Sequence, residues 1–392
     1  MQRTQIAIIG GGPAGLLLSQ MLYLDGIDNV VIERQCRAHV LGRIRAGVLE
    51  EGTVSLLRSI GLGARMDREG KAHDGTMIVW QDRPQFLIDT FKHTGRRMMA
   101  YGQTAITQDL YAAADARGGQ IIERAENVRL EHINSTTPSV CYTIDGVEQR
   151  LACEFIAGCD GFHGASRRSI PNEVLSTFER SYPFGWLGIM SETPPIDDIV
   201  YAHHERGFAL ASQRSPVLSR YYIQCPTETN LSEWPDDRFW EELRARFPQT
   251  IAEQIVTGPS VEKSIAALRS FVAEPMCYGR LFLAGDAAHI VPPTGAKGLN
   301  LAVSDVFYLH RAFEAHFNSG NDGHLEAYSE TALRRVWSAE RLSWWLTKLL
   351  HLFPDQDGFD TRCNQNEFDH LCGSTAAQAA LAEQYVGLPF NA

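Results

Sequence analysis

Basic residues are scarce in this chain of 392 residues, and that scarcity limits its partners. Lys and Arg number 36 against 47 Asp and Glu, which gives a formal net charge of −11. A surface that binds nucleic acid needs a basic face that neutralises phosphates. We therefore expect no nucleic-acid partner, and any cationic site must be local.

Closely spaced cysteine pairs are missing as well. The eight cysteines include no C-x-x-C pair and do not form the dense framework of a small secreted domain. We therefore expect a reducing, cytoplasmic location, and we predict no metal site.

Long apolar runs are limited to one stretch, residues 6–24, which carries no charge and is long enough to suggest a membrane span or a signal peptide. Gly10, Pro13 and Gly15 would break a spanning helix, and no small-residue cleavage site precedes Asp25. We therefore expect a strand, a turn and a helix here, and no membrane partner. Internal repeats and low-complexity tracts are also absent from the sequence.

What remains is typical of a soluble enzyme with two or three subdomains, at 44% hydrophobic and 21% charged residues. Buried runs and helical periodicity predict alternating strands and helices in the first part of the chain. Strands of a parallel sheet are expected at 5–10, 29–33, 153–159 and 280–284, and helices at 13–25, 50–60 and 105–118.

Later segments differ from this pattern. Between residues 176 and 268 the alternation of apolar and polar residues predicts an antiparallel sheet. Residues 326–352 form a helical run with Trp337, Trp344 and Trp345, which we expect in the core or at a subunit interface. The sequence after this run predicts loops as far as the C-terminus.

The first motif is a glycine-rich turn. Gly10, Gly12 and Gly15 stand in G-x-G-x-x-G register directly after the apolar run 6–9, so backbone N–H groups can meet a pyrophosphate at a helix N-terminus. A second apolar run ends at Glu33, eighteen residues after Gly15, where a carboxylate can bind an adenosine ribose. Together they predict a βαβ unit that binds an ADP moiety. The alternative is an accidental glycine-rich turn.

The second motif lies in the last third, where Gly285 and Asp286 follow an apolar strand. A carboxylate there can hold the ribityl hydroxyls of a flavin, although a lone Asp at a strand end is often only a helix N-cap. Lys297 follows, and the helix after it directs its positive N-terminal end toward the same region. This helix end and Lys297 can stabilise the anion of a reduced flavin.

A hairpin offers an anion site. Residues 208–214 and 219–222 read as its two strands, and period two places Ser212 with Arg214 on one face and Arg220 with Tyr222 on one face. A register centred on Val217 predicts Ser212 opposite Tyr222 and Arg214 opposite Arg220. Two opposed arginines need an anion, and a benzoate carboxylate suits the planar fork of Arg214. The alternative is a solvated sheet face with exposed arginines.

Three segments together resemble the single-component flavoprotein aromatic hydroxylases: residues 10–15, Cys159-Asp160-Gly161 and Gly285-Asp286. The similarity to members of this family extends over essentially the whole chain, through residues 43–50, 182–186, 292–300 and 385–389. It implies a mixed α/β fold in which a Rossmann-like FAD-binding domain carries an inserted antiparallel-sheet substrate domain and a C-terminal helical segment. The expected boundaries are 1–175 for the FAD-binding domain with an excursion near 74–98, 176–268 for the substrate domain, 269–325 for the return, and 326–392 for the helical interface region.

The resemblance also implies how a tight, non-covalent FAD is held. Asn300 is expected to hydrogen-bond the isoalloxazine edge, and Gln103 and Arg45 to hold the ribityl and pyrophosphate region, with Asp160 close by. The other expected cofactor residues are Gly10, Gly12, Gly15, Glu33, Arg43, Ala46, Gly47, Val48, Asp286, Lys297 and Leu299.

The activity implied is the conversion of 4-hydroxybenzoate, O2 and NADPH to 3,4-dihydroxybenzoate, water and NADP+. Attack by a flavin hydroperoxide requires an electron-rich ring, so the substrate phenol must lose its proton. Tyr201 and Tyr385 match the tyrosines that contact the phenol and carry its proton away, and His73 matches the outer end of that relay. The carbonyl of Pro293 completes the phenol site. By the same resemblance, Ser212, Arg214 and Tyr222 are expected to bind the carboxylate, and Arg220 to influence the flavin. Without the resemblance, both tyrosines would be ordinary half-buried residues.

No second G-x-G-x-x-G turn follows, so the nicotinamide nucleotide is expected to dock transiently. The residues that match its contacts in the family are Arg34, Gln35, Arg43, Arg45, His163 and Arg269. Arg34 can pair a 2′-phosphate, which favours NADPH, although His39 stands where a tyrosine is expected. The tryptophan-rich helix suggests a homodimer. Alternatives are a hydroxylase of another phenolic acid, a flavoprotein oxidase or dehydrogenase, and a non-catalytic regulator on this fold.

Overall fold

The first layer of the fold is a sheet of mostly parallel strands. A computed structural model describes residues 2–42 and 47–390. In spatial order its strands are β19 (Cys277–Tyr278), β20 (Leu281–Leu283), β13 (Phe155–Gly158), β2 (Ile6–Ile9), β3 (Asn29–Ile32) and β9 (Gln120–Ile122). Only β19 runs antiparallel to its neighbour among these strands. The four strands predicted for a parallel sheet are confirmed.

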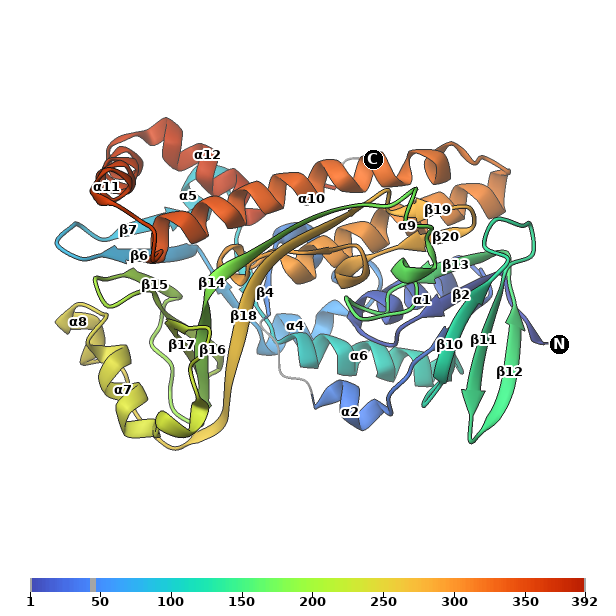
Figure 1. The fold of residues 1–392 in the computed structure, drawn as a ribbon, viewed down its shortest axis with the longest axis horizontal. Coiled ribbons are helices and arrows are strands. Elements are labelled where there is room, and N and C mark those ends of the chain that lie inside the picture. Colours follow the sequence, from blue (N-terminus) through green and yellow to red (C-terminus); the bar gives the residue numbers. More distant parts are fainter. Residues whose placement is uncertain (1, 43–46, 391–392) are drawn as a thin grey trace.

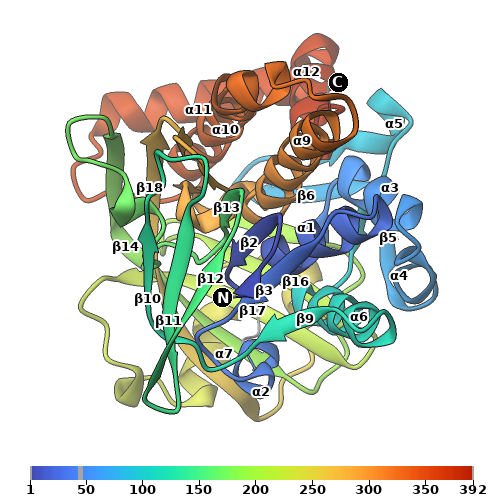
Figure 2. The ribbon, with the colours of Figure 1, turned by 90° about the vertical axis from the view of Figure 1, so that its right-hand side faces the viewer.

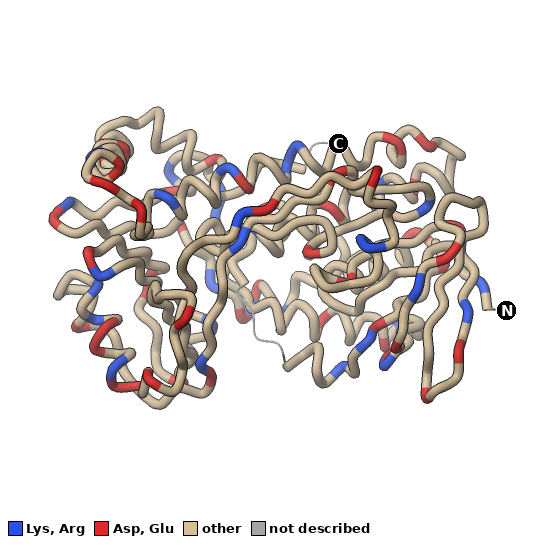
Figure 3. The backbone as a smooth tube through the Cα atoms, in the orientation of Figure 1, with Lys and Arg blue, Asp and Glu red and all other residues tan. Residues whose placement is uncertain are grey.

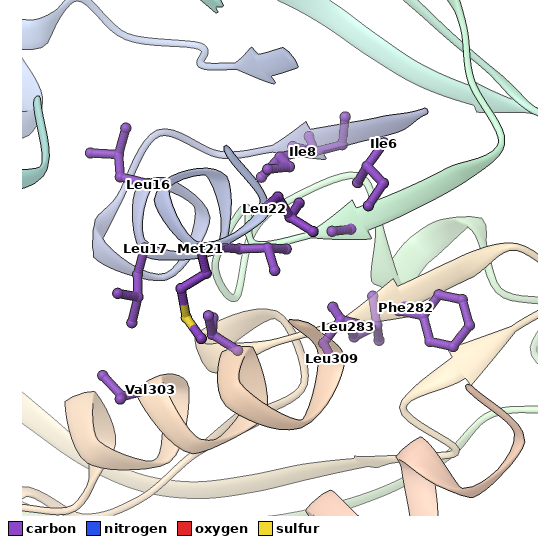
Figure 4. Packing of buried hydrophobic residues seen from close by; sticks show 14 of the residues in the cluster. Ile6, Ile8, Leu16, Leu17, Met21, Leu22, Phe282, Leu283, Val303 and Leu309 are labelled. Atoms are coloured by element: carbon purple, nitrogen blue, oxygen red, sulfur yellow. The ribbon is translucent and has the colours of Figure 1, made fainter. Parts of the chain in front are cut away.

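Helices cover this sheet. The predicted helices are confirmed as α1 (Pro13–Leu24), α3 (Glu51–Ser59) and α6 (Gln103–Ala116), and α9 (Gly298–Ser319) packs beside α1. In Figure 4, Met21 extends from α1 toward α9, and it belongs to one buried cluster with Val303 of α9, Ile8 of β2 and Leu283 of β20. Strand β2 is buried on both faces and α1 is almost wholly buried. This burial is why residues 6–24 carry no charge.

The second sheet is largely antiparallel. Its order is β21 (His289–Ile290), β18 (Ser260–Glu274), β14 (Ser176–Ser191), β17 (Leu218–Pro226), β16 (Ala209–Ser215), β15 (Val200–His203), β6 (Gly75–Trp80) and β7 (Phe86–Asp89). The pair of β15 and β6 is parallel. Thus two strands from residues 75–89 extend the sheet formed by the later part of the chain.

The two faces of this sheet bury different clusters, as the period of two requires. Trp186, Tyr201 and Leu210 belong to one cluster, which includes residues of the C-terminal helices. Leu187 and Tyr221 belong to the other, which is covered by α7 (Asp236–Arg244) and α8 (Gln249–Ala252). The candidate site lies on the first of these faces.

Long elements connect the two sheets. Strands β14 and β18 pair along most of their length, and Figure 1 shows them running from one end of the molecule into the other. Helix α10 (Gly323–Leu350) has 28 residues and spans much of the long axis above them (Figures 1 and 2). It packs on α9 and touches β18, so it braces both sheets.

The remaining elements form smaller units. One sheet has the order β1 (Gln2–Arg3), β12 (Val147–Ala152), β11 (Ser139–Ile144), β10 (Glu126–Glu131), and another has the order β4 (Val48–Leu49), β8 (Met98–Ala100), β5 (Lys71–His73). The short helices are α2 (Arg37–Leu41), α4 (Gly63–Glu69) and α5 (Thr90–Thr94), with 3-10 turns at Arg167–Ser169, Leu231–Glu233, Gly285–Ala287 and Pro293–Gly295.

The prediction of a loop-rich C-terminus is wrong. After α10 the chain forms α11 (Gly358–Gly373) and α12 (Thr375–Val386). Asp357 and Ser374 precede these helices, and their side chains accept hydrogen bonds from the N–H groups of Asp360 and Ala377. These are N-caps, which start a helix even where its apolar periodicity is weak.

Two further sequence expectations concern the whole chain. The boundary predicted at residue 268 falls inside β18, and the division into domains stays a prediction. Over residues 2–42 and 47–390, no helix has both the length and the apolar character needed to cross a membrane. Figure 3 shows acidic and basic residues interspersed over both ends of the molecule.

Candidate active site

A cavity of about 860 Å³ lies between the two sheets and receives residues from both glycine motifs. It also reaches the face of the antiparallel sheet at Arg220 and Tyr222. The predicted site residues that line it are Gly10, Gly12, Glu33, Arg34, Gln35, Val48, Gln103, Asp160, His163, Tyr222, Asp286, Pro293, Lys297 and Leu299. Arg43, Arg45 and Ala46 lie outside the described residues.

The three glycines of the first turn have separate structural tasks. Gly10 has φ +108°, and a Cβ there would lie 2.3 Å from the carbonyl oxygen of Cys159. A Cβ on Gly15 would lie 2.0 Å from the carbonyl oxygen of Gly10, so Gly15 allows α1 to pack on the turn. Gly12 lines the cavity and has no neighbour within 4 Å of its Cβ position. The turn therefore leaves room for a pyrophosphate where α1 begins.

Glu33 secures this turn from the end of β3. One carboxylate oxygen accepts the N–H of Gly11 at 2.6 Å, and the other accepts the N–H of Gln35 at 2.7 Å. Both oxygens keep a further lone pair and the residue lines the cavity, so a ribose hydroxyl can still donate to it.

Asp160 follows β13 and lies beside Gly10, and both residues line the cavity. Its Oδ2 accepts the N–H and the hydroxyl of Ser166, each at 2.9 Å, whereas its Oδ1 is buried without a hydrogen-bond partner among the described residues. Burial raises the pKa of Asp160, and the bonds from Ser166 oppose that rise. An unsatisfied buried oxygen on a residue that lines the cavity fits a site for a hydroxyl or N–H donor.

The loop that carries Asp286 is fixed by hydrogen bonds to Asp305 on α9. Gly285 has φ +63° and donates its N–H to Asp305 Oδ2 at 2.8 Å. The same oxygen lies 2.6 Å from His289 Nε2. Burial lowers the pKa of His289, but Asp305 outweighs it and the net shift is upward. The pair of His289 and Asp305 thus fixes the turn that brings Asp286 to the cavity.

Lys297 is less available to a flavin than expected, because its ammonium group is bound within the protein. Nζ donates to Glu50 Oε1 at 2.6 Å and to the carbonyl oxygens of Gln384 and Tyr385 at 2.7 and 2.8 Å. Glu50 Oε2 in turn pairs with Arg335 at 2.6 Å. Burial lowers the pKa of Lys297, and Glu50 opposes that shift. The group is a buried ionic network with the carboxylate at its centre.

Asn300 uses its whole amide in the same region. Nδ2 donates to the carbonyl oxygens of Val48 and Ala296, at 3.0 and 2.9 Å. Oδ1 accepts the N–H of Glu50 and the hydroxyl of Thr53, at 2.9 and 2.8 Å. These four bonds saturate the amide, so a bond to the isoalloxazine edge must replace one of them. The cofactor role of Asn300 stays a prediction.

The hairpin forms, but its predicted register is wrong. Ser212 pairs with Arg220 and Leu210 pairs with Tyr222, whereas Ser215 pairs with Leu218 across a tight turn. A bulge after Gln213 absorbs the extra residue at Arg214. The alternation could not fix the turn length, and a shift of two residues leaves every side chain on its original face. Ser212, Arg220 and Tyr222 therefore still share the site face.

Arg214 lacks a carboxylate partner within the described part of the chain. Its Nη1 donates to Gln213 O at 3.1 Å and to the hydroxyl of Ser212 at 3.4 Å, while Nε is buried without a partner. Burial lowers the pKa of Arg214, the hydroxyl of Tyr222 opposes this, and Arg220 adds to it. A half-buried guanidinium whose buried Nε lacks an acceptor is suited to an anion.

Arg220, unlike Arg214, has a carboxylate partner within the protein, and its predicted influence on the flavin stays a prediction. Its Nη1 lies 3.0 Å from Glu262 Oε1, and its Nη2 donates to the hydroxyl of Ser264 at 3.1 Å. Its guanidinium also lies over the ring of Tyr222, at 4.8 Å from the centroid. The side chains that line the cavity here are those of Arg220, Tyr222, Glu262 and Ser264.

A pair of tyrosine hydroxyls lies on the same sheet face, in the row of Leu210. Tyr385 on α12 donates to the hydroxyl of Tyr201 on β15 at 3.3 Å, and lies 2.8 Å from the hydroxyl of Thr76. Tyr201 and Tyr385 are 3% and 0% exposed, and burial raises the pKa of both, that of Tyr201 well above its ordinary value. Both hydroxyls are therefore neutral, and each can accept one proton while it donates another.

His73 is buried on β5, and its Nε2 has no hydrogen-bond partner among the described residues. Burial lowers the pKa of His73, so the ring is neutral. No hydrogen bond in the described residues joins it to Thr76 or to either tyrosine, and its place in the relay stays a prediction.

Three residues of this site were not predicted. Thr76 is placed by the pairing of β6 with β15, and Glu50 stands at the start of α3. Glu262 is placed by the pairing of β14 with β18. The residues not predicted are therefore Thr76, Glu50 and Glu262. Each of these contacts joins distant parts of the sequence, which local patterns do not reveal.

Comparison with known proteins agrees with this geometry. A family model described as FAD binding domain matches residues 3–343. The chain is 48% identical over 391 residues to p-hydroxybenzoate hydroxylase of Acinetobacter baylyi, covering 99% of this chain and 96% of that protein. It is 27% identical to rifampicin monooxygenase of Streptomyces venezuelae, over 82% of this chain and 67% of that one. The crystal structure of p-nitrophenol 4-monooxygenase from Pseudomonas putida superposes with a TM-score of 0.82 at 17% identity, covering 99% of this chain and all of that one.

Proposed function

This chain belongs to the FAD-binding-domain family of flavoprotein monooxygenases, and we propose that it hydroxylates 4-hydroxybenzoate to 3,4-dihydroxybenzoate with O2 and NADPH. The observation that carries the proposal is a half-buried guanidinium, with a buried Nε and no carboxylate partner among the described residues, near a buried pair of tyrosine hydroxyls. An anion and a phenol at opposite ends of one ring suit these two sets of groups.

The carboxylate end is served by Arg214. Its planar fork can bind both oxygens of a carboxylate, and the hydroxyls of Ser212 and Tyr222 lie beside it. The pKa of Arg214 is lowered by burial, and a bound carboxylate restores the environment that favours its charge.

The phenol end is served by Tyr201 and Tyr385. In the structure Tyr385 Oη donates to Tyr201 Oη, so both hydroxyls must turn before the phenolic proton can move outward. Tyr201 Oη then accepts that proton and passes its own to Tyr385 Oη, which passes one to Thr76 Oγ1. Thr76 releases its own proton in turn toward His73, the proposed outer end of the relay. Neither tyrosine has to ionise by itself, which their raised pKa values would oppose. The substrate ring gains the electron density that hydroxylation needs.

FAD, when bound, activates O2 and supplies the oxygen atom that enters the ring. The residues that would hold it are those of the open glycine turn with Glu33, Asp160 and Asp286, which line one cavity. Gln103, Val48 and Leu299 line it as well, and Gly47 is a buried neighbour of Tyr101. Nothing in this set suggests a covalent attachment residue, so FAD is expected to leave on acid precipitation.

NADPH is the proposed reductant. Arg34, Gln35 and His163 line the cavity, and Arg34 is exposed where it can meet a 2′-phosphate. Arg269 pairs with Glu179 at 3.3 Å and stacks on Phe162, next to His163. The values of kcat/KM for NADPH and NADH decide this preference.

The direct test is NADPH oxidation by the purified yellow protein, with and without 4-hydroxybenzoate, followed by identification of the product. We expect fast oxidation only with the substrate, and 3,4-dihydroxybenzoate as product. Slow oxidation in both cases, with fast oxidation on another phenolic acid, would reassign the substrate. Oxidation that yields only hydrogen peroxide would point to an oxidase.

A homodimer in the cytoplasm is also proposed. Exposed residues on α10 form a stripe with alternating spacings of three and four: Arg334, Trp337, Arg341, Trp344 and Lys348. The two tryptophans are 41% and 38% exposed, and Phe178 packs on Trp337 while remaining 48% exposed. Large aromatic residues in such a stripe are typical of a subunit interface. All eight cysteines are free, which suits a reducing compartment.

A further inference from the structure

Arg220 and Arg214 approach the same part of the sheet face, yet among the described residues only Arg220 forms an ion pair. Arg220 lowers the pKa of Arg214 and Glu262 raises it, so all three charges lie near one another. Arg220 has the carboxylate of Glu262 at 3.0 Å, whereas Arg214 has no carboxylate among the described residues. The side chain of Arg220 reaches the carboxylate of Glu262, and that of Arg214 does not form this ion pair.

Strand pairing shows how Arg220 reaches Glu262. Glu262 on β18 pairs with Met190 on β14, and Met190 pairs with Arg220 on β17, so the two charged residues share a row with one strand between them. In the adjacent row, Ser264, Gly188 and Tyr222 stand side by side. Both rows face the cavity.

Gly188 leaves the space through which Arg220 passes. A Cβ at Gly188 would lie 3.3 Å from Arg220 Nη2 and 2.5 Å from the ring of Tyr222. With no side chain there, the guanidinium crosses above the middle strand and donates to Ser264 Oγ at 3.1 Å. Ser264 donates in turn to Glu262 Oε1 at 3.2 Å. Glu262, Ser264 and Arg220 thus close a small network over a glycine.

We propose that Glu262 is a positioning residue that sets the charge selectivity of the site. By engaging Arg220, it leaves Arg214 without a carboxylate partner among the described residues, so the site accepts an aromatic monocarboxylate and disfavours a dicarboxylate. This inference rests on the proposed function, since it concerns the same ligand pocket. Glu262 does not bind the ligand itself, because a carboxylate repels an anion. It acts by keeping Arg220 paired.

Two ligands test whether Glu262 sets the charge selectivity. One is 4-hydroxybenzoate, and the other is 4-hydroxyphthalate, which carries a second carboxylate next to the first. Their Kd values are measured from flavin absorbance changes of the holoenzyme. Wild type should bind the dicarboxylate at least about tenfold more weakly. Glu262→Gln frees Arg220 and should shrink the ratio of the two Kd values by about tenfold, as expected for one charge-assisted contact in a partly buried site.

Three further variants make the test specific. Glu262→Asp keeps the charge and should keep the wild-type ratio. The double variant Arg220→Gln with Glu262→Gln has no freed cation and should return to that ratio. Glu179→Gln removes the carboxylate that pairs with Arg269 on the same two strands, outside the cavity lining, and should leave the ratio of the two Kd values unchanged.

The outcomes are distinguishable. An unchanged ratio in Glu262→Gln, or a reduced ratio that persists in the double variant, overturns the role of Glu262. Equal affinity of wild type for both ligands overturns it without any substitution. Failure of wild type to bind 4-hydroxybenzoate contradicts the proposed function itself, and the inference with it.

Discussion

The role of each cation in the site depends on whether it has a carboxylate partner within the protein. Lys297 and Arg220 are cations that pair with Glu50 and Glu262, whereas Arg214 has no carboxylate partner among the described residues. A charge buried without a partner is costly, so we expect the carboxylate of the ligand at Arg214.

Arg214→Lys should weaken 4-hydroxybenzoate binding by about tenfold or more, because lysine keeps the charge but loses the fork that binds both oxygens. FAD affinity should stay near the wild-type value. Titration of the holoenzyme with 4-hydroxybenzoate, followed by flavin absorbance, gives the Kd. Equal Kd values for the two proteins would remove Arg214 from the site.

Tyr201→Phe and Tyr385→Phe should each lower the yield of 3,4-dihydroxybenzoate per NADPH. Either change breaks the chain of hydroxyls at Tyr385 Oη and Tyr201 Oη, so the phenol loses its proton less readily. The loss should be larger for Tyr201, which is proposed to contact the phenol. NADPH consumed, hydrogen peroxide released and product formed are measured together. Tyr328→Phe, a buried tyrosine that binds Leu283 O, is the control, and full coupling in both relay variants contradicts the proposed relay.

At the scale of elements, the sequence predicted best what is local. The strands and helices of the nucleotide-binding unit follow from buried runs and three glycines, and Gly10, Gly12 and Gly15 lie as the motif requires. The hairpin register depended on a bulge and a tight turn, which alternation does not encode. Helices α11 and α12 depended on caps more than on periodicity.

The site could be predicted only where the family resemblance or a motif supplied its residues. Glu50, Thr76 and Glu262 act through contacts between segments far apart in the chain. Their partners are set by strand order and helix packing, so no local pattern distinguishes Glu262 from any other acidic residue of a strand.

The packing of α10 on β18 gives a prediction about pH. Glu340 on α10 is 5% exposed, and burial raises its pKa to about 7, while bonds from Ser270 and the backbone of Phe271 and the charge of His289 lower it. Because the folded protein then holds a proton that the unfolded chain releases near pH 4.3, stability falls as the pH rises from about 4.3 to about 7. Glu340→Gln should remove this loss.

The expected gain from Glu340→Gln is on the order of 1–3 kcal/mol of unfolding free energy above about pH 7, and close to zero near pH 4. Thermal unfolding from pH 5 to pH 8 measures it, and the variant should show the smaller decline in Tm. Glu330→Gln, an exposed residue of the same helix, is the matched control. Parallel Tm curves for wild type and Glu340→Gln would mean that Glu340 is not protonated in the fold.

At the scale of the whole molecule, α10 is the element that faces both inward and outward. Its inner face braces the two sheets, and its outer stripe presents Trp337 and Trp344 to solvent. An isolated chain gains nothing from exposing two tryptophans on one helix face, whereas a second copy can bury them.

Trp344→Glu should therefore convert a dimer into a monomer, because a carboxylate in the centre of an interface must be buried without a partner. Bound FAD and the substrate Kd should remain, since Trp344 does not line the active-site cavity. Light scattering coupled to size-exclusion chromatography gives the mass of each protein. Phe359→Glu, which changes a 76% exposed aromatic residue outside the stripe, should leave the dimer intact. A dimeric Trp344→Glu variant, or a monomeric wild type, would show that the stripe on α10 does not join two copies of this chain.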